Sequence, residues 1–172
     1  MVWELDKAHS DISFSVKHMM VSTVKGRFKS FDATIELDPA AVERSKVEAT
    51  VDIASLDTQE EKRDGHLKSA DFFDAENHPK MTFKSTKVTK SGDDLEVVGD
   101  LTIRGTTKPV TLKGTLEGPA KDPWGGQRYG FSLNGAIERE DFGLVWNVAL
   151  ETGGVLVGKN VKIHIEGELI AK

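Results

Sequence analysis

Histidines and carboxylates are the residues of this chain that could perform acid–base or metal chemistry. The five histidines are His9, His18, His66, His78 and His164, and no two of them are two, three or four residues apart. Metal ligands on one strand or helix usually recur at those spacings, so we expect no metal site. The chain has no cysteine and no catalytic or phosphate-binding motif of the common kinds. The sequence therefore predicts no catalytic residue, no cofactor and no enzymatic activity.

One segment nevertheless allows an acid–base interpretation. Asp64, Asp71 and Asp74 lie close in sequence to Arg63 and His66. Such groups are common at helix ends and in surface ion pairs, and we favour that explanation. An enzyme remains an open alternative, in which substitution of His66 or Asp64 would abolish turnover but leave ligand uptake intact.

The elements that position these residues are mostly strands, because apolar and polar residues alternate along most of the chain. Ile12, Phe14 and Val16 alternate with polar residues, and residues 161–166 repeat the pattern. Successive side chains of a strand point to opposite faces, so each run has one apolar and one polar face. Many such strands in 172 residues predict a mainly β protein: a single antiparallel barrel domain, residues 1–172, with an apolar interior.

A short helical insertion is predicted near residues 58–73. Thr58 and Glu61 have the spacing of a capping box, and good helix formers follow them. The apolar residues of this segment gather at its C-terminal end, so we expect it to plug one mouth of the barrel. A closed barrel of about eight strands either fills with side chains or holds one small ligand.

Charge and hydropathy exclude several classes of partner. The net charge is −5, the isoelectric point is about 5.6, and lysines and arginines are scattered singly, which predicts no nucleic-acid binding. No stretch approaches the roughly 20 apolar residues of a membrane span, so we expect no stable membrane insertion. The first residues lack the pattern of a signal peptide. We therefore expect a cytoplasmic protein, or a periplasmic one if a signal has been removed.

A series of short motifs runs in order along the chain. The motifs include Trp3-x-Leu5-Asp6-x-x-His9-Ser10, Gly26-Arg27-Phe28, Arg63-Asp64-x-His66-Leu67, His78-Pro79-x-Met81-x-Phe83, Gly99-x-Leu101-Thr102-Ile103-Arg104-Gly105 and Arg139-x-Asp141-Phe142-Gly143-Leu144-x-Trp146. Together they resemble the YceI-like family of lipid-binding proteins. The resemblance implies an extended lipocalin-like barrel whose interior holds a long apolar ligand, such as a polyisoprenoid chain or its quinone or phosphate derivative.

From these expectations we predict a binding site for a long-chain isoprenoid or other lipid. The predicted wall residues are Phe14, Val16, Phe28, Ile53, Phe83, Leu101, Ile103, Phe131 and Leu133. The predicted mouth and plug residues are Met19, Leu67, Phe72, Phe73, Trp146 and Leu156. His18, His66 and Arg63 are expected to meet a polar head group.

Two other kinds of function stay open beside this one. The first is an enzyme that acts on an isoprenoid or another amphiphile. The second is a packed-barrel module that binds a protein partner and would contain no co-purifying lipid. Strands at a mouth could also pair between two copies as a homodimer, although no particular residue indicates this.

Overall fold

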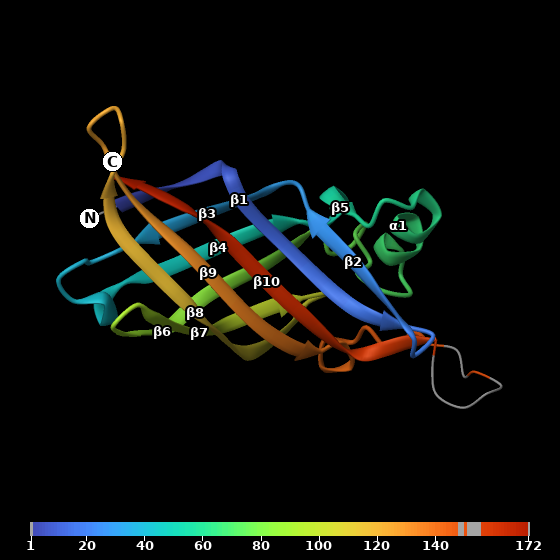
Figure 1. Cartoon of the computed structure of the whole chain (residues 1–172). Coiled ribbons are helices and arrows are strands. Elements are labelled where there is room, and N and C mark those ends of the chain that lie inside the picture. Colours follow the sequence, from blue (N-terminus) through green and yellow to red (C-terminus); the bar gives the residue numbers. More distant parts are fainter. Residues whose placement is uncertain (1, 148–149, 151–155, 172) are drawn as a thin grey trace.

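The computed structural model describes residues 2–147, 150 and 156–171, and its strands form one antiparallel sheet (Figure 1). The strands are β1 (Val2–His18), β2 (Ser22–Phe28), β3 (Phe31–Glu36), β4 (Lys46–Asp52), β5 (Leu56–Asp57), β6 (Lys80–Ser91), β7 (Asp94–Ile103), β8 (Thr106–Lys121), β9 (Gln127–Glu138) and β10 (Val157–Ala171). Pairing of β10 with β1 closes an eight-stranded ring, and β2 and β5 extend from β1 outside it. The predicted mainly β, lipocalin-like barrel is confirmed.

The alternation read from the sequence decides which side chains face the interior. Phe14 lies opposite Ile163 across the β1–β10 pair, and both point into the barrel. Their neighbours Ser13 and His164 form the next pair and face outward. Because opposite residues of an antiparallel pair share a face, each apolar run contributes its whole inner face to the core.

Two details of the strands differ from the sequence pattern. The apolar–polar alternation is interrupted at Ala8-His9-Ser10, yet β1 is one continuous strand with a register shift between Asp6 and Asp11. Gly26 lies within β2, where a glycine often marks a bulge, but it pairs regularly with Phe14. A Cβ atom at Gly26 would lie 2.4 Å from the Phe14 ring, so this glycine makes room for an aromatic ring that covers it.

Helical structure among the described residues is limited to α1 (Glu61–Lys68) and three short 3-10 turns, η1 (Val42–Arg44), η2 (Ile53–Ser55) and η3 (Arg139–Phe142). The predicted insertion at residues 58–73 is therefore real, but its helix is shorter. In Figure 1, α1 lies at one end of the barrel, close to β5 and β2.

The N-terminus of α1 also differs from the expected capping box. Glu60 is the N-cap, and its carboxylate accepts a hydrogen bond of 2.6 Å from the Arg63 backbone N–H. The Thr58 hydroxyl instead donates to the Asp64 carboxylate, which also accepts the Thr58 backbone N–H at 2.9 Å. The same sequence spacing therefore serves a different hydrogen-bond arrangement.

Candidate functional site

A long, narrow apolar cavity of about 260 Å³ lies inside the barrel. Val157 and Leu169 both line it and are twelve residues apart on β10, which corresponds to about 40 Å of strand. Strands in such barrels tilt by roughly 35–45°, so the lined length along the barrel axis is about 30 Å. A small volume spread over that length fits a thin chain better than a compact ligand.

The side chains that face the cavity are almost entirely apolar. Five further polar residues border it from outward-facing strand positions: Asp11, Ser13, Asp32, Thr82 and Glu166. The polar side chains on inward positions are Ser10, Ser45 and Arg139. Ser10 donates its hydroxyl to the Asp6 carbonyl at 2.6 Å, and the Ser45 hydroxyl accepts from the Asp38 N–H at 3.0 Å.

The guanidinium of Arg139 is also used within the protein. It is 3% exposed and donates to four backbone carbonyls, those of Leu144 (2.6 Å), Gly158 (2.8 Å), Trp146 (3.0 Å) and Val157 (3.2 Å). Burial lowers the pKa of Arg139 from its ordinary value, and nearby Glu140 opposes that shift. The inward polar groups thus already have partners, so the cavity favours an apolar chain over a polar head group.

Most of the predicted site residues line this cavity. They are Phe14, Val16, Phe28, Leu67, Phe72, Phe73, Phe83, Leu101, Ile103, Phe131 and Leu133. They come from β1, β2, β6, β7, β9 and the segment around α1, which only a closed barrel brings together. Their contact with a ligand remains a prediction.

Three predicted site residues near the plug lie outside the cavity wall: Ile53, predicted for the wall, His66, predicted for a head group, and Trp146, predicted for the plug. Ile53 is on η2 and packs into a separate small core with Val51 and Leu56. His66 and Trp146 stack edge to face with ring centroids 4.6 Å apart, and the His66 Nε2 atom lies 2.9 Å from the Asp71 carboxylate. They hold the outer side of the plug, one layer behind the cavity.

Three further predicted residues lie outside the wall: His18 and Met19 at the tip of the β1–β2 hairpin, and Leu156 beside the tip, directly before β10. His18 ends β1, and the turn that follows carries Met19 away from the barrel interior. The Met19 N–H donates to the Leu156 carbonyl at 2.7 Å. Met19 shares the outward parity of Ser13 and Ser15, and the turn begins directly after His18, so alternation does not bring Met19 to the cavity.

Arg63 was expected to meet a ligand head group. Its guanidinium instead donates to the Thr58 hydroxyl at 2.8 Å and to the Thr58 carbonyl at 2.7 Å. The sequence analysis also passed over Arg139 as a site residue. The sequence gives little signal for this role, because Arg139 stands beside Glu140 and Asp141 in a charged run and its burial depends on distant backbone acceptors.

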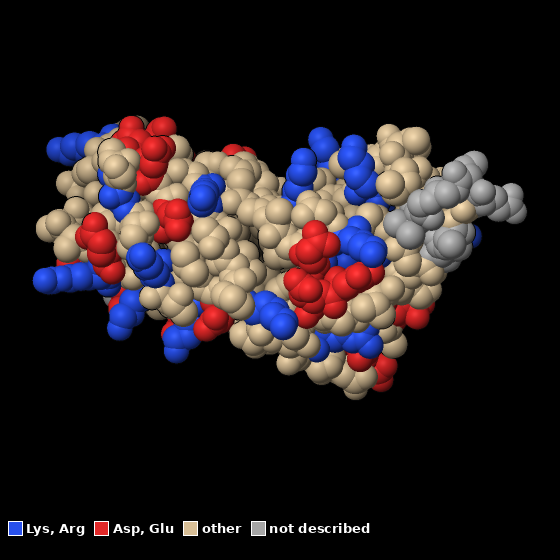
Figure 2. All heavy atoms as spheres, turned by 90° about the horizontal axis from the view of Figure 1, so that it is seen from below, with Lys and Arg blue, Asp and Glu red and all other residues tan. Residues whose placement is uncertain are grey.

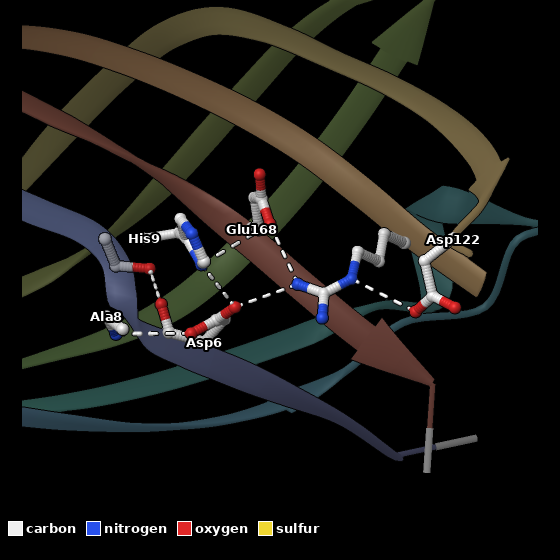
Figure 3. Close-up of polar contacts among 7 residues, drawn as sticks. Asp6, Ala8, His9, Asp122 and Glu168 are labelled. Atoms are coloured by element: carbon white, nitrogen blue, oxygen red, sulfur yellow. Dashed lines mark hydrogen bonds and ion pairs between the residues drawn. The ribbon is translucent and has the colours of Figure 1, made fainter. Parts of the chain in front are cut away.

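A second polar cluster lies at the opposite end of the barrel, near the chain termini (Figure 3). Arg128 donates to Asp6 at 2.8 Å, to Glu168 at 2.9 Å and to Asp122 at 3.2 Å. Asp6, His9 and Glu168 offer ligand atoms within 4.8 Å of one another, but the Arg128 guanidinium already contacts both carboxylates. The arrangement is an ion-pair network between β1, β9 and β10.

This network predicts a pH-dependent contribution of Asp6 to stability. Hydrogen bonds from His9 and Arg128 lower the pKa of Asp6 from 3.8 to about 2. A depressed pKa stabilises the fold above the unfolded value and loses that effect as the pH falls towards the folded value. The same contact raises the pKa of His9 above 6.5, so its contribution is complete below that pH and is lost as the pH rises through the raised value.

We expect Asp6→Asn to lower the urea midpoint most between about pH 4 and 6.5, where both partners carry their charges. The difference from the parent should shrink as the pH approaches about 2. Asp32→Asn is the matched control, because the Asp32 carboxylate is exposed, lies 3.5 Å from Lys7 and otherwise accepts only the neighbouring Ala33 N–H among the described residues. A difference that stays constant across this range would contradict the assignment.

Surface features add little that is specific to a partner. On the face shown in Figure 2, acidic and basic side chains are intermixed and no continuous basic surface is visible. No helix in the described part of the chain is long and apolar enough to span a membrane. The cavity is therefore the feature on which a functional assignment must rest.

Comparison with known proteins agrees with the motifs and the barrel. The sequence profile of the YceI-like domain matches residues 3–169. The chain belongs to the YceI-like family. A UPF0312 protein of Staphylococcus epidermidis is 47% identical over 167 residues, which cover 96% of this chain and 95% of that protein.

Solved structures show the same YceI-like architecture. The YceI protein of Campylobacter jejuni is 40% identical, with a TM-score of 0.79 over 98% of this chain and 96% of that one. A polyisoprenoid binding domain from Saccharophagus degradans has a TM-score of 0.73 over 99% and 98% of the two chains. At 14% identity, that second likeness shows the fold alone.

The YceI-like motifs of this chain lie largely where the barrel needs support. Asp6 and His9 belong to the ion-pair network at one end, and Arg63 and Asp64 fix the start of the plug through Thr58. Arg139 joins η3 to the beginning of β10. These polar motif residues therefore shape the barrel ends, whereas apolar residues form the cavity.

Proposed function

We propose that this YceI-like barrel binds one long isoprenoid chain in its cavity and sequesters or carries it. The observation that supports this most directly is a thin cavity about 30 Å long whose polar side chains are already hydrogen-bonded. The shared fold of the polyisoprenoid binding domain from Saccharophagus degradans agrees with this ligand class.

Chain length should dominate affinity. Burial of apolar surface contributes about 25 cal/mol per Å², so a ligand that buries roughly 400 Å² gains about 10 kcal/mol. Association costs roughly 4–15 kcal/mol, which a ligand with half that contact area would barely offset. A short prenyl chain should therefore bind weakly, and affinity should increase until the chain fills the cavity.

The cavity also favours a neutral head group. Among the described residues, Arg139 is the only cationic side chain in the lining, and its donors face backbone carbonyls. An anionic phosphate inside would lose its hydration without gaining a free cation. We therefore propose a prenyl quinone or prenyl alcohol as the better fit, with the charged head of a prenyl phosphate remaining at a mouth.

Native mass spectrometry of the purified protein, followed by lipid extraction, tests the proposal. We expect a stoichiometric long-chain isoprenoid, or uptake of one equivalent when a prenyl quinone is added. Prenyl quinones of increasing length and the matching prenyl phosphates then test the dependence on length and head group. Bare protein that takes up neither ligand would contradict the proposal and favour the interaction module.

A further inference from the structure

Among the described residues, the longest consecutive run of exposed large apolar side chains lies at the tip of the β1–β2 hairpin. Met19, Met20 and Val21 are 49%, 57% and 84% exposed. Figure 1 shows this tip at the end of the barrel where α1 lies. Single exposed apolar residues are ordinary on protein surfaces, but three consecutive residues at a protruding tip form a contact surface.

The backbone of the tip is unusual for these residue types. Met19 and Met20 have φ angles of 52° and 64°, and the Val21 N–H donates to the His18 carbonyl at 3.2 Å. Turns with two consecutive left-handed residues strongly favour asparagine and glycine. Methionine is less favourable than asparagine or glycine in this backbone conformation. Strained backbone of this kind is concentrated at functional positions.

Basic residues flank the apolar tip. Between residues 12 and 31 the chain has four lysines or arginines and no acidic residue, although its net charge is −5. Lys25 and Lys162 lie on either side of Ser15 on the outward face, and Lys17 is two residues further along β1. None of these three lysines forms an ion pair within the described residues.

Two of the acidic groups near this end already have partners. Asp57 pairs with Lys29 at 2.9 Å, and Glu140 lies 3.9 Å from Lys159. The three lysines without an ion pair give the outer face of the hairpin itself a local positive charge, since residues 12–31 contain no acidic side chain. Apolar side chains bordered by lysines are typical of segments that enter the interface of an anionic bilayer.

The tip is continuous with one end of the cavity wall. Val157 lines the cavity and lies opposite His18, the last residue of β1. The next residue, Met19, binds the Leu156 carbonyl through its N–H and begins the exposed turn. An object that contacts the tip is therefore close to the α1 end of the cavity.

We propose that the β1–β2 tip docks on the surface of an anionic lipid bilayer. Met19, Met20 and Val21 enter the interfacial layer, and the lysines on the outward face of β1, β2 and β10 contact lipid phosphates. Docking places the α1 end of the cavity where an isoprenoid ligand is dissolved. This role in ligand transfer rests on the proposed function, whereas the docking itself does not.

Vesicle co-sedimentation of the full chain tests the docking. We expect binding to vesicles of phosphatidylcholine mixed with phosphatidylglycerol, and weaker binding to phosphatidylcholine alone. The variant Met19→Asn/Met20→Gly should bind at least about tenfold more weakly, because it removes most of the apolar tip. Those residues suit the turn, so its thermal unfolding midpoint should equal or exceed that of the parent.

Two further variants separate charge from apolar contact. Lys17→Glu/Lys25→Glu should remove the preference for anionic vesicles. Trp124→Ser is the matched control, because Trp124 is 84% exposed but lies in the β8–β9 loop at the opposite end. We expect it to bind vesicles as the parent does.

The proposal is overturned if the parent binds neither kind of vesicle, or if the Met19→Asn/Met20→Gly variant binds as tightly as the parent. Prenyl quinone binding in detergent solution distinguishes the two proposals. A tip variant that keeps this binding but extracts quinone from vesicles more slowly supports docking for ligand transfer. Vesicle binding by a parent that binds no quinone would support docking while contradicting the isoprenoid function.

Discussion

Arg139→Met is expected to destabilise the protein by about 3–5 kcal/mol, because it leaves several buried carbonyls without a donor. Each orphaned acceptor costs roughly 1–3 kcal/mol, and methionine fills similar space without donating. For a domain of this size the change corresponds to a fall of about 10 °C or more in the thermal midpoint.

Lysine at position 139 provides the informative comparison. An ammonium group has three donors at one point, whereas the carbonyls lie on two separated segments, at Leu144 and Trp146 and at Val157 and Gly158. We expect Arg139→Lys to recover only part of the lost stability. Lys162→Met, on an exposed position of β10, should change the midpoint little.

Arg139→Met should also weaken ligand binding, because Leu144 and Val157 line the cavity at the end that Arg139 supports. Thermal unfolding and prenyl quinone titration together check this prediction. A midpoint within about 2 °C of the parent would show that Arg139 is dispensable for the fold.

Alternation predicted the barrel because it is local and repeats with a period of two. Phe14, Phe83 and Leu133 were assigned to the interior from their own strands, and the closed sheet brings them to one cavity. Alternation does not predict which strands pair, since nothing in the local sequence indicates that β10 pairs with β1. The register shift near Asp6 likewise depends on contacts with a strand more than 150 residues away.

The errors and omissions arose where side chains form non-local hydrogen bonds. Thr58 and Glu61 match a capping box, but Asp64 competes for the threonine and Glu60 takes the cap position. The role of Arg139 was missed because its carbonyl partners at Leu144 and Val157 belong to two separate segments that no local pattern connects. Met19 is an apolar residue directly after β1, but it has the outward parity of Ser13 and Ser15 and lies in the turn after His18.

Ala49→Phe is expected to reduce prenyl quinone affinity by about a hundredfold or more, because the new ring fills part of the cavity. Ala49 lies between Ala33 and Phe83 on the inward face of three adjacent strands, and all three residues line the cavity. A phenylalanine ring that denies the ligand about 150 Å² of apolar contact removes about 4 kcal/mol.

The control for this change is Glu48→Phe, which places the same ring on the adjacent residue of β4. Glu48 pairs with Thr34 and Lys84 on the outward face, so its side chain lies outside the cavity. Both variants should unfold near the temperature of the parent, because Ala49 borders empty space and Glu48 borders solvent. Titration with prenyl quinone should then separate them, since only the inward ring competes with the ligand. Equal prenyl quinone affinities for the two variants would place the ligand outside the barrel. Full uptake by Ala49→Phe together with loss of uptake in Glu48→Phe would reverse the assignment of the inward and outward faces of β4.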